Sequence, residues 1–252
     1  MTPPFAIAVA DARLKPAAEQ LAADLHAPLH TSRRPADARF LLRLTPDHLE
    51  LALGPTPPAD TPPGLTALVP SLAPRTTPLA DPLAKALGLR KGNPHRPTVV
   101  DATAGLLADA ATIAALGCPV TALERHPAVH ALAADTLRRA TPPPAITLHH
   151  ADAAHALPTL DPPEVIHLDP MFPPRRKGRP QKAMWMLHAM LGETDAHDAP
   201  ALLRIALQHA TRRVIVKRPR LAPPLNEGHA DLPAPAAQHT GKSHRYDIYP
   251  TT

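Results

Sequence analysis

The chain has 252 residues, of which 44% are hydrophobic, and its 27 Lys and Arg against 22 Asp and Glu give a formal net charge of +5. This length and apolar content suffice for one large α/β domain, alone or with a small appendage. The single cysteine, Cys118, excludes a disulfide framework and a thiolate metal site. There is no run of 18 apolar residues that would predict a membrane span, and no signal-like N-terminus. We therefore expect a cytoplasmic globular protein with no metal or membrane partner. The excess of basic over acidic residues favours an anionic partner. Composition predicts no particular oligomeric state.

The first part of the chain predicts a small α+β domain. Its apolar patterns indicate a strand, a helix and then a hairpin, at residues 5–10, 16–25, and 40–44 with 48–53. Residues 54–81 are rich in Pro and Thr and predict an irregular linker. We therefore place a domain boundary near residue 80, with a small N-terminal domain at 1–80 and a second domain at 81–252.

The second domain opens with the pattern of a cofactor-binding α/β unit. After a short helix at 81–89, residues 98–102 predict a strand with Asp101 near its end, followed by Gly105 and an alanine-rich helix reaching Leu116. A small residue at such a turn lets the backbone approach a ligand. Only one glycine is present, which disfavours a dinucleotide-binding dehydrogenase because that fingerprint needs three.

Acidic residues follow the next two predicted strands. Glu124 ends the strand 119–123, nineteen residues after Gly105, where an acid accepts hydrogen bonds from ribose hydroxyls. It could instead cap the predicted helix 127–139. Asp152 follows the strand 146–149, at a place where an adenine amino group could be bound. An N-cap for a helix at 153–157 is an equal alternative for Asp152.

Residues 165–177, VIHLDPMFPPRRK, indicate the catalytic centre. Val165 to Leu168 predict a buried central strand, which ends at Asp169 because Pro170 has no N–H for the sheet. Methylation of an exocyclic amine on a base requires hydrogen-bond acceptors for the NH2 group and an aromatic platform for the extruded ring. Asp169 and the Pro170 carbonyl could be the acceptors, with Phe172 as the platform. Alternatively, Asp169 caps a turn and Phe172 belongs to the core.

Basic residues follow this centre and a later strand. A nucleic-acid enzyme would use such residues to hold phosphates, although a solvated loop is the simpler reading. The candidates are Arg175, Arg176, Lys177, Arg179 and Lys182, with Lys217 and Arg218 after a strand at 214–216. The remaining pattern predicts helices at 184–191 and 201–210 and a last strand at 246–249.

Five ordered blocks resemble the RsmJ family of S-adenosylmethionine-dependent methyltransferases, which methylate N2 of a guanine in 16S ribosomal RNA. The blocks are VVDATAGLLADA, ALGCPVTALERHP, VIHLDPMFPP, RVIVKRP with the following APPL, and GKSHRYDIY, within residues 84–251. The resemblance implies a Rossmann-like class I methyltransferase sheet of seven strands, mostly parallel with a final antiparallel strand. It also implies S-adenosylmethionine as cofactor, and 16S ribosomal RNA or the small ribosomal subunit as partner. The implied cofactor contacts are Ala108, Asp109, Glu124, Arg125, Asp152, Ala153 and Asp169, beside Asp101 and Gly105 of the first strand and turn.

The sequence departs from the family pattern at three places. The family usually has Gly-Arg at Leu107-Ala108, a serine pair at Asp152-Ala153, and a Gly- and Arg-rich segment where residues 65–81 contain only Arg75 as a basic residue. Two other functions therefore stay open. One is an amine-directed methyltransferase acting on DNA adenine or another RNA, and the other is a non-catalytic RNA-binding descendant.

Overall fold

The computed structural model describes residues 5–31, 37–72, 79, 81–170, 182–192 and 195–251. The chain forms two compact units. The first comprises residues 1–71, 131–139 and 172–194, and the second comprises residues 72–130, 140–171 and 195–252. Two later segments of the chain thus belong to the first unit, so it is not made of the N-terminal residues alone.

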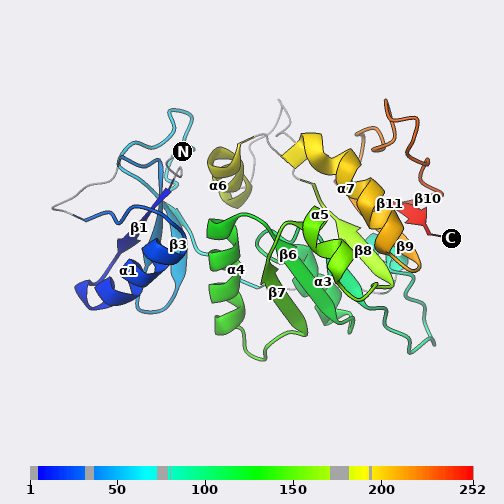
Figure 1. Ribbon diagram of the computed structural model, residues 1–252, viewed down its shortest axis with the longest axis horizontal. Helices are drawn as coiled ribbons and strands as arrows, with labels where there is room; N and C mark the ends of the chain where they lie inside the picture. Colours follow the sequence, from blue (N-terminus) through cyan, green and yellow to red (C-terminus); the bar gives the residue numbers. More distant parts are fainter. Residues whose placement is uncertain are drawn as a thin grey trace. The chain divides into compact units, whose positions relative to one another are not determined.

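The first unit contains a four-stranded sheet in the order β1-β2-β3-β4 (Figure 1). Strands β1 and β2 are parallel, and the other two pairings are antiparallel. The expected strand, helix and hairpin at the start of the chain are confirmed, and β4 lies within the stretch expected to be irregular. The elements are β1 Phe5–Val9, η1 Ala12–Leu14, α1 Lys15–Asp24, β2 Phe40–Leu44, β3 Leu49–Leu53, β4 Ala67–Leu68 and, later in the chain, α6 Lys182–Leu191.

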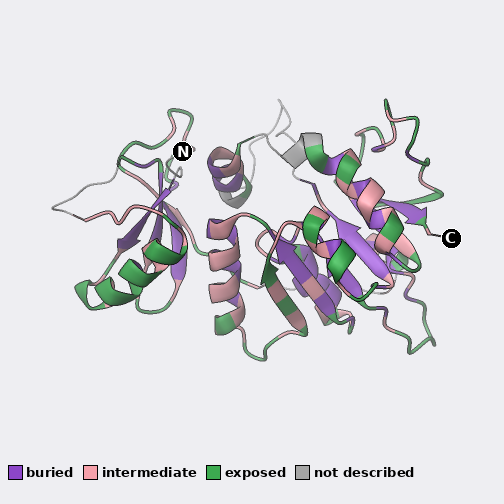
Figure 2. Ribbon diagram, viewed as in Figure 1, coloured by how far each residue is buried: buried purple, intermediate pink, exposed green. Residues whose placement is uncertain are grey.

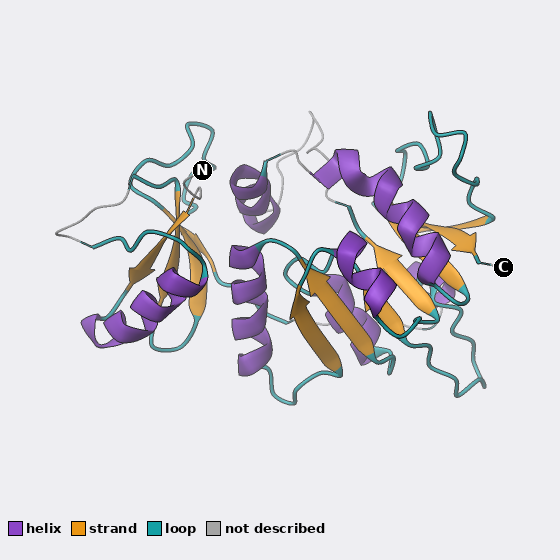
Figure 3. Cartoon of the chain, in the orientation of Figure 1, coloured by secondary structure: helices purple, strands orange, loops and turns teal. Residues whose placement is uncertain are grey.

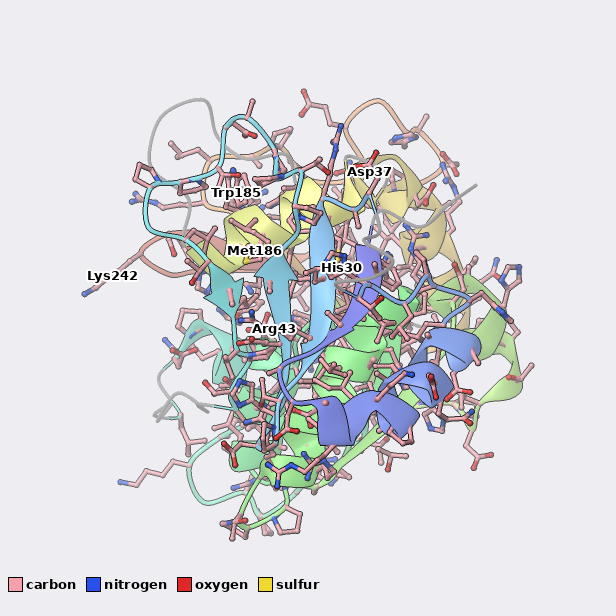
Figure 4. All side chains as sticks on the ribbon, turned by 90° about the vertical axis from the view of Figure 1, so that its left-hand side faces the viewer. His30, Asp37, Arg43, Trp185, Met186 and Lys242 are labelled. Atoms are coloured by element: carbon pink, nitrogen blue, oxygen red, sulfur yellow. The ribbon has the colours of Figure 1, made fainter. Side chains whose placement is uncertain are left out.

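The later segments of the first unit are held to its N-terminal part by polar contacts. Trp185 on α6 donates its indole N–H to Asp60 at 3.4 Å, and Asp135 accepts from the backbone N–H of Leu49 at 3.0 Å. Across the hairpin, Arg43 faces Glu50 at 2.5 Å. Figure 4 labels Arg43 on β2 and Trp185 on α6. The Trp185–Asp60 and Asp135–Leu49 contacts thus join segments that are distant in sequence.

The second unit is built on a seven-stranded sheet in the order β10-β11-β9-β8-β5-β6-β7. Strands β5 to β9 are mutually parallel, whereas β11 runs antiparallel to β9 and to β10. The expected seven-stranded, mostly parallel sheet is confirmed. Its strands are β5 Val99–Asp101, β6 Val120–Glu124, β7 Ile146–His150, β8 Val165–Leu168, β9 Arg213–Pro219, β10 Ala237–Thr240 and β11 His244–Pro250.

Helices cover both faces of this sheet. In Figure 1, α5 and α7 lie in front of the sheet and α3 lies behind it, and α7 packs on β9 while α3 packs on β6 and β7. The inner strands are almost wholly buried and the edge strand β7 is largely exposed (Figure 2). The helical elements are α2 Pro82–Ala86, α3 Ala108–Ala115, α4 Pro127–Arg139, whose last nine residues belong to the first unit, α5 Ala153–Ala156, η2 Leu157–Thr159 and α7 Asp195–His209.

Two elements of the second unit differ from the sequence-based expectation. Helix α7 begins at Asp195 and continues through Pro200, whereas the sequence pattern predicts a start at 201. Pro200 lies in the second turn, where its missing N–H costs one helix hydrogen bond. Strand β10 was not expected, because its residues AQHT show no apolar alternation. It forms by pairing with β11 at the sheet edge, and the preceding residues 220–236 contain no helix or strand (Figure 3).

Candidate active site

The charged strand ends lie at one edge of the second unit's sheet. Because β5 to β9 are parallel, their carboxyl ends all open on this edge. From β5 the chain proceeds to β6 and β7 on one side and then returns to β8 on the other. In an open α/β sheet, the edge at such a change of direction is where ligands bind. The edge is therefore the candidate active site.

Glu124, the last residue of β6, connects two parts of this edge. Its Oε2 accepts from the Gly105 N–H at 2.9 Å, and its Oε1 accepts from the His126 N–H at 2.7 Å. Gly105 has φ +51°, and nothing lies within 4 Å of the position that a Cβ would take there. A carboxylate thus stands beside an open glycine turn.

The turn between β5 and α3 is fixed by its neighbours. Ala104 donates its N–H to the Leu123 carbonyl at 3.0 Å. Leu107 takes a left-handed conformation, φ +66°, with its side chain completely buried. Helix α3 then begins at Ala108, which is exposed, and buries Asp109 in its first turn. The predicted pair Ala108-Asp109 therefore divides into one residue that faces outward and one that faces inward.

Asp169 follows β8 and is held by its backbone and by its side chain. Its N–H donates to the Thr103 hydroxyl at 2.6 Å, which joins the ends of β8 and β5. Its Oδ2 accepts from Lys217 Nζ at 2.6 Å, and 36% of its side chain is exposed. The next residue, Pro170, is buried. The expected catalytic carboxylate is thus fixed in position and accessible from outside.

Lys217 of β9 contacts two carboxylates. Its Nζ lies 2.6 Å from Asp169 Oδ2 and 2.6 Å from Asp109 Oδ2. Burial alone would lower the pKa of Lys217, but the two carboxylates outweigh burial and raise that pKa well above the ordinary lysine value. Burial raises the pKa of Asp169; Lys217 opposes that rise and Asp109 adds to it, so the net shift is upward.

His167 was not singled out by the sequence, although it lies beneath the same edge. Its side chain is completely buried, with Nδ1 3.2 Å from Asp101 Oδ1 and Nε2 3.9 Å from Asp109 Oδ2. Burial alone would lower the pKa of His167, but the two aspartates raise it above the ordinary histidine value. The available signal was its spacing of two from Asp169, since alternate residues of a strand share a face.

Asp152 and Arg125 lie at the ends of β7 and β6. Asp152 caps α5 by accepting from the Ala154 N–H at 2.8 Å, which is the alternative role considered for it. Arg125 Nη1 lies 3.7 Å from Asp152 Oδ2 and 3.2 Å from Asp198 Oδ2. Ala153 is buried at the start of the short helix. Capping uses one carboxylate oxygen of Asp152, and its cofactor role stays a prediction.

The candidate RNA contacts are only partly described by the structure. Phe172, Arg175, Arg176, Lys177 and Arg179 lie outside the described residues, and Lys182 begins α6. Arg218 is 6% exposed and donates to the Pro223 carbonyl through Nε at 3.0 Å and Nη2 at 2.5 Å. Arg218 therefore supports the loop after β9 from within, and Lys217 is engaged by carboxylates.

Within the part of the chain that the structure describes, no group of three or more His, Cys, Asp or Glu side chains could hold a metal ion. No helix in those ranges is long and apolar enough to cross a membrane.

The strand order, the open glycine turn and the carboxylates at successive strand ends define an α/β enzyme of the class I methyltransferase type. Residues 75–251 match the family described as "Putative SAM-dependent methyltransferase". The chain belongs to this family of S-adenosylmethionine-dependent methyltransferases.

Several similar proteins share one name. The chain is 50% identical over 177 residues to the "Ribosomal RNA small subunit methyltransferase J" of Edwardsiella ictaluri, covering 66% of this chain and 67% of that protein. A protein of the same name from Neisseria meningitidis is 47% identical, and the match covers 61% of this chain and 63% of that protein. Another from Yersinia pestis is also 47% identical, and the match covers 68% of this chain and 67% of that protein. The matches thus span about two thirds of the length of these relatives.

One solved structure resembles nearly the whole chain. It is a SAM-dependent methyltransferase from Neisseria gonorrhoeae, with a TM-score of 0.67 and 32% identity, and the match covers 96% of this chain and 95% of that one. Family and fold together establish S-adenosylmethionine as the cofactor of this protein.

The residues at the sheet edge fit such a cofactor. The sulfonium and the amino group of S-adenosylmethionine are cationic, and Asp101, Asp109 and Asp169 supply carboxylates at one edge. The space beside Gly105 is open, with Glu124 next to it, as a ribose requires. The described residues therefore provide both the charge and the room that the cofactor needs.

Proposed function

We propose that this protein transfers a methyl group from S-adenosylmethionine to the exocyclic N2 amine of a guanine in 16S ribosomal RNA. The observation that carries the proposal is Asp169, a carboxylate held at 2.6 Å by Lys217 at the end of a central strand, partly exposed and followed by Pro170. The name shared by the relatives supports ribosomal RNA of the small subunit as the substrate.

The cofactor is expected to be held mainly from β5, β6 and the turn between β5 and α3. Glu124, at the end of β6 beside the Gly105 turn, would accept from the ribose hydroxyls. Asp109 and Asp169 would face the cationic part of the cofactor. Contacts from Asp101, Gly105, Ala108, Arg125 and the Asp152-Ala153 pair complete the proposed set. When bound, S-adenosylmethionine supplies an electrophilic methyl group.

Asp169 and Pro170 would orient the target amine. The lone pair of an aromatic amine is delocalised into its ring, so hydrogen-bond acceptors on both N–H groups help to draw it out of conjugation. Asp169 would accept one hydrogen and the Pro170 carbonyl the other, while Phe172, outside the described residues, would stack on the flipped base. The attack then depends on orientation more than on a strong base.

The single cysteine argues against carbon methylation through a covalent intermediate. Cys118 is buried and precedes β6, so it lies at the end of that strand opposite Glu124. Burial raises the pKa of its thiol to about 11. Since the thiolate is the attacking form, Cys118 is not equipped to add to a pyrimidine ring. An amine target fits the available groups better.

RNA would be held in part by the basic segment after the catalytic turn. Arg175, Arg176, Lys177, Arg179 and Lys182 are close in sequence to Asp169, and their charges suit phosphates.

The experiment is nucleoside mass analysis of 16S RNA from cells that lack this protein. Three strains are compared: one carrying the wild-type gene on a plasmid, one carrying Asp169→Asn and one carrying an empty plasmid. The proposal expects N2-methylguanosine at one position with the wild-type gene and a strong reduction with Asp169→Asn. A change in methyladenosine would show a different amine substrate.

Unchanged nucleosides in all three strains, with RNA binding retained, would indicate a non-catalytic RNA-binding protein. A second assay identifies the form of RNA that is methylated. Purified protein is given naked 16S RNA in one reaction and small ribosomal subunits in another.

A further inference from the structure

We propose that Lys217 is a positioning residue for methyl transfer, holding Asp169 as an oriented, ionised hydrogen-bond acceptor while Asp109 holds Lys217 in place. This inference rests on the proposed function, in which Asp169 accepts from the target amine. It replaces the expectation that Lys217 contacts RNA phosphates.

The backbone places Lys217 beside Asp169. In the register of β8 and β9, Leu168 pairs with Val216, so the residues that come next along the chain are Asp169, just after β8, and Lys217 of β9. Lys217 itself is a strand residue, paired with Tyr246 of β11 on its other side. The position of the ammonium group is therefore set by a central strand with a neighbour on each side. It does not depend on a surface loop.

The contacts of Lys217 fix one oxygen of each aspartate. Its Nζ lies 2.6 Å from Asp169 Oδ2 and from Asp109 Oδ2, and an ammonium group has three N–H donors. Two of the three are thus directed at carboxylates. These two charge-assisted hydrogen bonds leave a single N–H donor, so an RNA phosphate would be at most a third partner of Lys217. Because Lys217 contacts Oδ2 of Asp169, we assign Oδ1 as the oxygen that accepts from the amine.

The charges around the cluster explain why Lys217 is needed. Asp101, Asp109 and Asp169 lie near one another, and among the described residues Lys217 and His167 are cationic or titratable groups that contact them. Without Lys217, burial and the repulsion from Asp109 would both favour protonation of Asp169. A protonated carboxyl would present an O–H to the amine, and its power to accept would fall.

The first test follows the ionisation of Asp169 without requiring activity. The carboxyl carbons of the full-length protein are labelled with ¹³C, and the Asp169 resonance is assigned by its loss in Asp169→Asn. We expect its titration midpoint to move to higher pH in Lys217→Met and in Lys217→Gln. Lys217→Arg, which keeps the charge, should leave the midpoint near the wild-type value. Lys15→Met is the matched control, because Lys15 lies on α1 in the other unit and is exposed.

The second measurement begins with the wild-type protein, where the visibility of one resonance does not depend on how any variant folds. An ammonium group held by two carboxylates exchanges its hydrogens slowly, so the Lys217 ¹⁵Nζ resonance should be visible and should shift in Asp169→Asn. A rapidly exchanging Lys217, or an Asp169 midpoint that is the same in wild type and Lys217→Gln, overturns the proposal.

The third measurement is the pH profile of kcat. Lys217→Gln should lower kcat at least tenfold near neutral pH, with recovery as pH rises and Asp169 ionises, and Lys217→Arg should restore part of the rate. Weaker RNA binding with a flatter salt dependence, and an unmoved pH profile, would instead make Lys217 a phosphate contact and refute the proposal. Absence of N2-methylguanosine from the wild-type reaction would refute the proposed function, whereas the titration of Asp169 decides the role of Lys217 in either case.

Discussion

Replacing Glu124 by glutamine tests the cofactor side of the site. The substitution keeps the size of the side chain and removes its charge. In the structure, both carboxylate oxygens accept from backbone N–H groups, Oε2 from Gly105 and Oε1 from His126. Glutamine has only one acceptor oxygen, so its NH2 group must face one of these two N–H groups.

The expected magnitude follows from these contacts. A hydrogen bond to a charged group contributes about 1.5–3 kcal/mol, and the amide loses one such bond and weakens the other. Glu124 is 9% exposed, so water replaces the lost partner poorly. We expect the free energy of unfolding to fall by about 2–3 kcal/mol. We also expect the Kd for S-adenosylmethionine to rise by roughly 5- to 30-fold, equivalent to about 1–2 kcal/mol, because a ribose hydroxyl meets a weaker acceptor.

Two measurements separate these effects. Urea unfolding without cofactor reports the loss of stability, and calorimetric titration of the folded variant at a temperature well below its Tm reports the cofactor affinity. Glu19→Gln on α1 is a control, since Glu19 forms an exposed contact with Lys15 in the other unit. If Glu124→Gln binds S-adenosylmethionine with the wild-type Kd, the predicted ribose contact of Glu124 is refuted. If its free energy of unfolding is also unchanged, the two backbone hydrogen bonds of Glu124 do not stabilise the fold.

Three further predictions concern catalysis, RNA and pH. Asp169→Asn should slow methyl transfer by about 100-fold at saturating cofactor, because an amide oxygen is a weaker acceptor than a carboxylate; single-turnover kinetics measures this rate. Replacing Arg175 and Arg176 by glutamine should weaken RNA binding, because fewer counterions are released from the RNA. The slope of log affinity against log salt, measured by filter binding over a salt series, should become shallower by roughly 1.5 to 2. Because Asp101 and Asp109 raise the pKa of His167 in the folded state, its contribution to stability is fully present below the unfolded value of about 6.5 and is lost as pH rises through the folded value. The unfolding free energy of wild type should therefore exceed that of His167→Gln by most at low pH, with the difference shrinking by about 1.4 kcal/mol per pH unit between the two values.

Each of these predictions has a clear contrary result. A wild-type rate in Asp169→Asn would remove the carboxylate from the reaction. A parental salt slope in the double arginine variant would make that segment ordinary surface. A stability difference that is flat or grows with pH would mean that His167 is neutral in the folded protein.

The sequence predicted those parts of the site that depend on local pattern. Pro170 indicated where β8 ends and so placed Asp169 at the sheet edge, and the pattern after β5 and β6 placed Gly105 and Glu124 at the same edge, where Gly105 N and Glu124 Oε2 lie 2.9 Å apart. These inferences succeeded because strand ends and turns are specified by neighbouring residues.

The contacts of Lys217 and His167 could not be predicted from the sequence. Lys217 is 108 residues from Asp109, and a lysine at a strand end looks the same whether it meets a phosphate or a carboxylate. His167 stands in an apolar strand, where its partner Asp101 is supplied by a strand 66 residues away. Such pairings arise from the order and register of the strands, which local periodicity does not encode.

Leu107 has a consequence for how the cofactor is received. For a residue that is not glycine, a left-handed conformation is unfavourable by roughly 1–2 kcal/mol. Full burial of a leucine side chain is favourable by about 1.5–3 kcal/mol and offsets this cost. Packing of Leu107 therefore holds the turn before α3 in shape without help from a ligand. An arriving cofactor meets a backbone that is already ordered, so little conformational entropy is lost on binding. A glycine at this position would leave the turn free to move between conformations, whereas the buried leucine keeps the turn rigid before the cofactor binds.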